Sequence, residues 1–331
     1  MYPERVFPGI DSPSSGSQEA SVPSPLVQAA TLETPPAPAQ PSYRSWSRAI
    51  GDITSAWQHR ELWGYLGWQD IKQRYRRSVI GPLWITISMA VTACALGLLY
   101  SAILGSTINT FLPYITVGFI IWNFINNCVL EGTEAFIANE GLIKHLPAPI
   151  SVHIFRTVWR QVLFFAHNLV IYFIVAAIFF KTMTNPYQLI EGGSWNPGIG
   201  WTVLLAIPAF VLLVVNSVWV TMLFGIIATR FRDIPPVIGS LMQLLFFMTP
   251  IVWFADALNK KNSLGGARPT WQKYVVESNP LYHYVDIVRA PLLGQQIHWH
   301  SWAIVGGLTI FGWGLALLAL RNYRARVSYW V

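Results

Sequence analysis

The chain has 331 residues, of which 53% are hydrophobic and only 11% are charged. Soluble domains carry about 25% charged residues, so this composition argues against an ordinary water-soluble protein and indicates that lipid is the main solvent. The net charge is +7, but the cations gather in short segments beside apolar stretches. This placement favours a signal for membrane orientation over a nucleic-acid surface.

Residues 1–45 differ in composition from the rest of the chain. Nine prolines lie there among Ser, Ala, Gln and Glu. Such a segment cannot bury enough apolar surface to offset the entropy lost on ordering, and it lacks the apolar central run of a signal peptide. We predict a disordered cytoplasmic tail at residues 1–45 and one membrane domain at residues 46–331.

A basic and aromatic segment, residues 57–80, precedes the first long apolar stretch. Ile71, Tyr75 and Val79 recur every four residues and would share one face of a helix. Basic residues with interleaved aromatics suit an amphipathic helix lying in the membrane interface, with its cations near anionic headgroups. A basic flank that only orients the first span is the alternative.

Six stretches are long and apolar enough to cross roughly 30 Å of hydrocarbon. They are residues 81–104, 111–130, 161–180, 201–228, 235–254 and 302–320. With the N-terminus inside, fifteen Lys and Arg residues belong to inner segments and six to outer segments. Because cytoplasmic segments carry the excess of positive charge, the sequence predicts an all-α integral membrane protein with six membrane-spanning helices and both termini in the cytoplasm.

Two segments between the predicted spans carry helix signals. On the inner side, residues 139–149 form a short segment broken by prolines, which end helices. It has the size of one or two helical turns presented to a partner, or of an ordinary loop. On the outer side, Asn279 followed by Pro280 is a helix-start signal. It predicts a short amphipathic helix that dips into the outer membrane face, or an isolated surface helix.

Candidates for catalytic chemistry are scattered. Glu131 and Glu134 share a helix face near the inner end of the second span, as a functional pair or as solvated interfacial acids. His283 and Asp286 are also three apart, which suits an acid–base pair or a surface hydrogen bond. The chain has no zinc-type spacing of His, Cys and Glu. The sequence also contains no Gly-x-x-x-x-Gly-Lys-Ser/Thr motif, so ATP hydrolysis would need a partner.

The chain resembles a known family, the ABC-2 type permeases that export O-antigen, capsular polysaccharide or teichoic acid. The resemblance covers roughly residues 57–325. The matching segments occur in the family's order: Trp68–Tyr75 with Gly81–Trp84, then Asn139 with Leu142–Lys144 and Pro147, then Arg230–Ile234, then Thr249-Pro250, and finally Asn279–Arg289. Each segment alone is weak, whereas five in order on the predicted topology are specific.

The resemblance implies a homodimer of permeases in the bacterial inner membrane, working with two ATP-binding subunits that hold ATP and Mg²⁺. No cofactor is expected in this chain. The substrate would be a lipid-linked polysaccharide, with O-antigen ahead of capsule. The broken inner loop would be the helix that couples to the ATPase, through Asn139, Leu142, Ile143, Lys144 and Pro147. The outer segment before the last span would form a pair of re-entrant gate helices.

Aromatic side chains are the candidates for the polymer path, because the apolar C–H faces of sugars pack on rings while their hydroxyls stay in water. The predicted fifth span offers Gln243, Phe246, Phe247, Pro250, Trp253 and Phe254 at three- and four-residue spacing. Trp84 and Trp122 lie in the first and second spans. The alternative is a purely structural role, in which these rings anchor the helices at the membrane interface or pack between helices.

Two other interpretations of the function stay open. The first is an ABC-2 exporter of another lipid or of a small molecule. The remote one is an intramembrane enzyme that modifies glycans, which would need a placed base, nucleophile or metal cluster. A gradient-driven transporter is disfavoured, because the centres of the predicted spans carry almost no charged groups.

Overall fold

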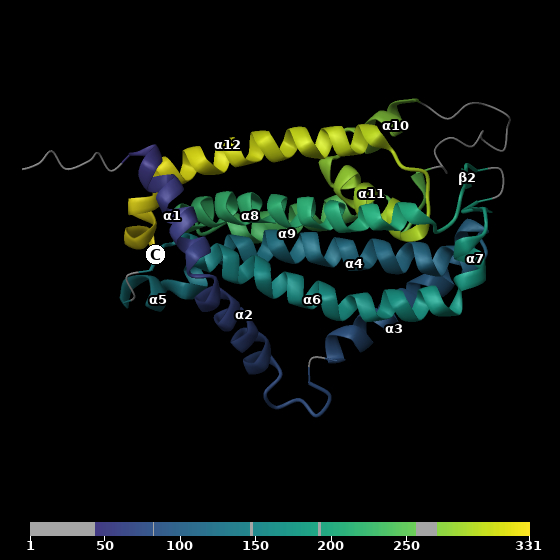
Figure 1. Ribbon diagram of the computed structural model, residues 1–331, viewed down its shortest axis with the longest axis horizontal. Coiled ribbons are helices and arrows are strands. Elements are labelled where there is room, and N and C mark those ends of the chain that lie inside the picture. The colour runs from purple at the N-terminus through teal and green to yellow at the C-terminus, as the bar shows by residue number, and fades with distance from the viewer. Residues whose placement is uncertain (1–43, 82, 146–147, 191–192, 256–269) are drawn as a thin grey trace, which may run out of the picture. The chain divides into compact units, whose positions relative to one another are not determined.

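The computed structural model describes residues 44–331 apart from residue 82 and residues 146–147, 191–192 and 256–269. The predicted tail therefore lies outside the described residues, but for its last two. The described chain is almost entirely helical (Figure 1). Its elements are α1 (Trp46–Gln58), α2 (Arg60–Arg74), α3 (Leu83–Leu104), α4 (Ile108–Thr133), η1 (Ile137–Asn139), α5 (Glu140–His145), α6 (Ser151–Ile178), α7 (Phe180–Thr184), the antiparallel hairpin β1 (Tyr187–Gln188) and β2 (Trp195–Asn196), η2 (Trp201–Leu205), α8 (Ala206–Arg230), α9 (Ile234–Met248), α10 (Thr270–Glu277), α11 (Pro280–Leu293) and α12 (Trp299–Trp330).

Five helices in the described part are long and apolar enough to cross a membrane. They are α3, α4, α6, α12, and α8 together with the preceding turn η2. Helix α4 is the most buried of them, because α3, α6, α8, α9 and α11 all pack against it. In Figure 1, α4, α6, α8 and α12 run alongside one another. Helices α3 and α12 are mostly exposed, as expected for helices that face lipid or a partner.

The predicted fifth span is a shorter helix than expected. Helix α9 has only 15 residues and ends at Met248. Thr249 adopts an extended conformation (φ −89°, ψ 133°), because the ring of Pro250 disfavours the helical conformation of the residue before it. Pro250, Trp253 and Phe254 therefore lie beyond the helix, and the prediction of one helical stripe from Gln243 to Phe254 is wrong.

Helix α2 is also shorter than predicted. It ends at Arg74, so Val79 lies outside the helix and is fully exposed. Beyond it, the backbone N–H of Gly81 donates to the Ser78 hydroxyl and Gly81 has φ +63°. This turn directs the chain from α2 into α3, and the predicted face of Ile71, Tyr75 and Val79 does not form.

Helix α6 begins ten residues before the predicted span, at Ser151. Its first turn is capped from α1, because the buried Asp52 accepts hydrogen bonds from the Ser151 backbone N–H (3.0 Å) and hydroxyl (2.6 Å). A carboxylate is favourable there because the N-terminus of a helix carries partial positive charge. Arg324 of α12 donates to the other Asp52 oxygen at 2.7 Å, so one acid joins α1, α6 and α12.

Candidate functional site

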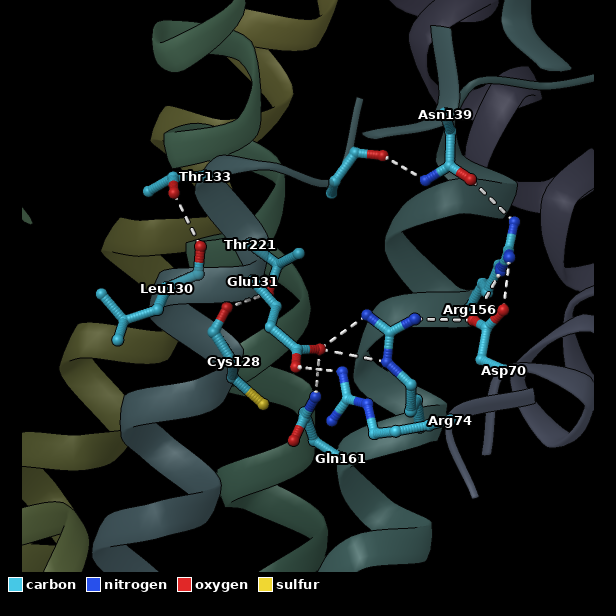
Figure 2. Close-up of polar contacts among 12 residues, drawn as sticks. Asp70, Arg74, Cys128, Leu130, Glu131, Thr133, Asn139, Arg156, Gln161 and Thr221 are labelled. Atoms are coloured by element: carbon cyan, nitrogen blue, oxygen red, sulfur yellow. Dashed lines mark hydrogen bonds and ion pairs between the residues drawn. The ribbon is translucent and has the colours of Figure 1, made fainter. Parts of the chain in front are cut away.

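Three helices meet in a network of ion pairs around Asp70 of α2 (Figure 2). Arg156 of α6 donates to both Asp70 oxygens, through Nε at 2.9 Å and Nη2 at 2.5 Å. Arg160, one turn later on α6, donates to Asp70 from Nη1 at 2.6 Å. The spacing of four residues places both guanidinium groups on the same face of α6. The bidentate geometry of the Arg156–Asp70 pair makes it strong and directional.

Arg160 also pairs with a second acid, Glu131 of α4. It donates to Glu131 Oε2 from Nη2 at 2.6 Å and from Nε at 3.0 Å. The Gln161 amide donates to the same oxygen, and Arg74 of α2 reaches the other oxygen at 3.3 Å. Arg160 therefore bridges two acids on two different helices, so it holds α2, α4 and α6 together.

The network is largely withdrawn from water. The side chains of Asp70, Arg156 and Arg160 are 14%, 14% and 17% exposed. Burial by itself raises the pKa of Asp70, but the hydrogen bonds and charges of Arg156 and Arg160 outweigh it and lower the pKa below the ordinary value of 3.8. Ionisable side chains in or beside membrane helices are costly unless they are paired, and here the pairing keeps Asp70 ionised at neutral pH.

Asn139 connects this network to the segment predicted to couple with the ATPase. Its Oδ1 accepts a hydrogen bond from Arg156 Nη1, and its Nδ2 donates to the Ala135 carbonyl, both at 2.7 Å. Asn139 is the last residue of η1, directly before α5. A push on α5 would therefore act on Arg156 through one side chain. The arrangement suits mechanical transmission rather than bond chemistry.

The other predicted coupling residues lie on α5, with one exception. Leu142 and Ile143 are half-buried, and Ile143 packs against the apolar cluster shared by α6, α8 and α12. Lys144 is exposed and donates to Glu140 Oε1 at 2.6 Å and to the Val331 carbonyl at 3.2 Å. Pro147 lies outside the described residues. The short helix expected in this segment is present.

The two inner acids of α4 have different environments. Glu134 caps the C-terminal end of α4 and is exposed. Glu131 is paired as described, so the interpretation of Glu131 as a merely solvated interfacial acid is wrong. The sequence did contain a signal for this network: Arg156 and Arg160, four residues apart beside an apolar span, required acidic partners.

The predicted channel residues do not gather on one face. Trp122 is buried in α4, and its ring lies 5.5 Å from that of Phe246. Trp84 on α3 and Phe247 on α9 are exposed, and Gln243 on α9 is exposed too. Trp253 lies after α9 and donates from its indole to the Phe247 carbonyl at 3.1 Å. Phe254 is buried between Phe111 and Tyr114.

Two side chains satisfy the non-helical backbone that follows α9. The Tyr114 hydroxyl is 3.0 Å from the carbonyl oxygens of both Pro250 and Trp253. Arg289 of α11 donates to the Pro250 carbonyl at 2.6 Å, and its guanidinium lies 4.3 Å from the centre of the Tyr114 ring. Non-helical backbone at membrane depth is tolerated only where protein covers its polar groups. No motif in the sequence indicates this role for Arg289 or Tyr114.

Helix α11 begins where the sequence predicts, since the Asn279 side chain accepts a hydrogen bond from the Leu281 N–H at 3.0 Å. Its burial, however, corrects a prediction. His283 and Asp286 are buried, and the Ser301 hydroxyl bridges them at 3.1 Å and 2.7 Å. The interpretation of this pair as a surface hydrogen bond is wrong, because α11 packs against α4, α8 and α12. The described residues contain no group of three or more His, Cys, Asp or Glu that would hold a metal ion.

The fold and this inner network define a multi-pass helical membrane protein in which ion pairs join α2, α4 and α6. Residues 61–293 match the family model of the ABC-2 type transporter, and the chain belongs to this family. Among curated proteins, it is 23% identical to an O-antigen export system permease protein RfbA of Klebsiella pneumoniae, over 66% of this chain and 82% of that protein. It is 24% identical to an O-antigen export system permease protein RfbA of Myxococcus xanthus, over 61% of this chain and 71% of that protein.

This membership assigns the chain to the membrane subunits of transporters rather than to enzymes. In this family the ATPase activity resides in a separate subunit. Together with the five apolar helices, it also makes the chain a multi-pass protein of the bacterial inner membrane.

Proposed function

We propose that this chain is the permease subunit of an ATP-driven exporter that moves a lipid-linked polysaccharide, O-antigen ahead of capsule, from the cytoplasmic to the outer face of the inner membrane. The observation that carries the proposal is the similarity to O-antigen export permeases over as much as 82% of their length. The similarity is not confined to one local motif, since residues 61–293 match the family model as a whole.

The proposed topology has six spans and both termini inside. Helix α9 would be the fifth span, although its 15 residues reach only about 22 Å at 1.5 Å per residue. The segment Thr249–Phe254 would cover the remaining depth, which the hydrogen bonds from Tyr114 and Arg289 make tolerable. The Lys144–Val331 hydrogen bond supports an inner loop and a C-terminus on the same side.

The proposed assembly is a homodimer with two ATPase subunits, which would bind ATP and Mg²⁺. Helices α3 and α9 support it, because each exposes a row of large apolar side chains. The polymer would pass between two such copies, beside the exposed Trp84, Gln243 and Phe247. Phe246 and Trp122 would support this wall from behind, since they pack on each other, and Trp253 would brace the end of α9. Helices α10 and α11 would be the gate helices.

Deletion of the gene tests the proposed function. We expect the glycan to disappear from the cell surface while its lipid-linked form accumulates inside, and the wild-type gene to restore export. Surface glycan would be measured with a lectin or antibody, and the accumulated species by mass spectrometry. Unchanged surface glycan in the deletion strain would refute the proposal. Accumulation of a different lipid would favour the other kind of ABC-2 exporter.

Leu142→Asp is expected to weaken association with the ATPase at least about tenfold, because a carboxylate buried without a partner at a contact costs more than 1.4 kcal/mol. The measurement is co-purification of the ATPase with the tagged permease, with surface glycan as the second readout. Leu62→Asp is the matched control, since Leu62 lies on α2 and is also partly exposed. Ile143→Asp should instead lower the amount of folded permease, because Ile143 packs against the core. Normal association of a well-folded Leu142→Asp variant would remove α5 from the coupling interface.

A further inference from the structure

A polar cavity of about 290 Å³ lies between α11, the β1–β2 hairpin and the segment after α9. Tyr282, Asp286 and Arg289 line it from one face of α11, because their spacing of four and three residues follows the turns of the helix. Asn196 of β2 lines it from the hairpin. Gln296 and His300, which are exposed, lie at its rim. Its volume is near the lower end of the range for small-molecule sites.

Three buried donors at this cavity have no hydrogen-bond partner among the described residues. They are Arg289 Nε, Asn196 Nδ2 and Gln295 Nε2, on residues that are only 3%, 6% and 8% exposed. Leaving a buried donor unpaired costs about 1–3 kcal/mol. A different nitrogen of Arg289, Nη1, already donates a hydrogen bond to the Pro250 carbonyl. The three unpaired groups therefore call for an acceptor inside the cavity.

The chemistry of the walls narrows the class of ligand. Asp286 and Glu277 line the same cavity as Arg289, so an anion such as phosphate would meet two acids. A purely apolar ligand would leave all three donors unpaired. The Tyr282 ring adds apolar surface, whereas Tyr114 and Phe254 pack against each other behind the wall. A sugar ring offers hydroxyl groups as donors and acceptors together with apolar C–H faces. It therefore complements all of these lining residues.

We infer that this cavity binds one sugar unit of the exported polysaccharide, at the end of the protein that carries α11. The inference rests on the proposed function and extends it by a saccharide subsite outside the path between two copies. Asn196, Gln295 and Arg289 donate to hydroxyl oxygens of the sugar, Asp286 accepts from a hydroxyl, and the Tyr282 ring packs on its C–H face. A single site with few hydrogen bonds binds weakly, which suits a polymer that has to move on.

The test uses the full-length chain in lipid nanodiscs and saturation-transfer NMR. The probes are the free monosaccharides of the host's surface glycan and, separately, inorganic phosphate. Asn196→Ala should weaken sugar binding about fivefold, as expected for one lost hydrogen bond, without lowering the Tm, because its amide nitrogen has no partner among the described residues. Asn185→Ala is the matched control, since Asn185 is exposed and its amide donates to the Lys181 carbonyl outside the cavity. Tyr282→Leu removes the ring that packs on the sugar and serves as the second cavity variant if Asn196→Ala folds poorly.

Weaker sugar binding in Asn196→Ala or Tyr282→Leu, with normal binding in Asn185→Ala, supports the inference. No sugar binding by the folded wild type, equal binding in all variants, or displacement of the sugar by phosphate would overturn it. These failures differ from failure of the proposed function. If only the saccharide subsite is wrong, the deletion strain still loses its surface glycan and regains it with the wild-type gene. If the proposed function is wrong, the deletion has no effect on surface glycan.

Discussion

Replacing Gly294 with Ala is expected to leave almost no folded protein. Gly294 ends α11 in the left-handed conformation (φ 63°, ψ 35°), which costs a residue with a side chain about 1–2 kcal/mol. A Cβ at this position would also overlap the backbone carbonyl of Gly198, whose N–H donates to the Gly294 carbonyl at 3.0 Å. A backbone group cannot move aside as a flexible side chain can. We expect a total loss of more than about 4 kcal/mol, which is exceptional for one substitution and close to the whole stability of many domains.

Gly105 provides a matched control for the Gly294 prediction. Its φ is +62°, but a Cβ there would meet nothing within 4 Å. Gly105→Ala should therefore cost only the conformational term and leave a folded peak in size-exclusion chromatography with a modestly lower Tm. The measurement is the amount of monodisperse protein extracted in mild detergent. Similar yields of the two variants would show that the contact between Gly294 and Gly198 is not a close one.

Removing Arg160 is expected to have the second largest effect. Arg160→Ala leaves Asp70 and Glu131 each without their shared partner, and breaking a buried ion pair from one side costs about 3–5 kcal/mol. Because the Arg160 side chain is 17% exposed, we expect a value near the lower end of that range. The Tm should fall by roughly 2–4 °C for each kcal/mol. Thermal unfolding followed by tryptophan fluorescence in detergent would measure it.

Arg74 is the control for Arg160, because it pairs with the same acid. Its side chain is 49% exposed and contacts Glu131 through one bond of 3.3 Å. Exposed pairs of this kind contribute about 0–1 kcal/mol, so Arg74→Ala should change the Tm little. If Arg74→Ala and Arg160→Ala were equally destabilising, the network would not depend on the bridge between Asp70 and Glu131. If neither had an effect, the pairs would be dispensable for folding.

The sequence by itself determined the class of this protein. Insertion into a bilayer depends on the length of an apolar run and on the basic residues beside it, and both are local properties of the sequence. It also determined where α11 begins, since the Asn279 cap and Pro280 act within one helical turn. The end of α9 at Met248 also has a local cause, because Pro250 disfavours the helical conformation of Thr249. The sequence alone predicts a longer span, because the residues that follow Pro250 are also apolar.

Only the tertiary structure decided which polar groups are partners. Asp70 and Arg160 are 90 positions apart in the chain, and neither sequence position predicts the other. The charged and polar face of α11 was expected to meet water or headgroups, but α11 packs among α4, α8 and α12. Its burial is tolerated because Arg289 finds the Pro250 carbonyl and the Tyr114 ring, while Asp286 finds Ser301. Burial of a polar side chain depends on whether distant segments supply its partner, and that is a property of the packed helices alone.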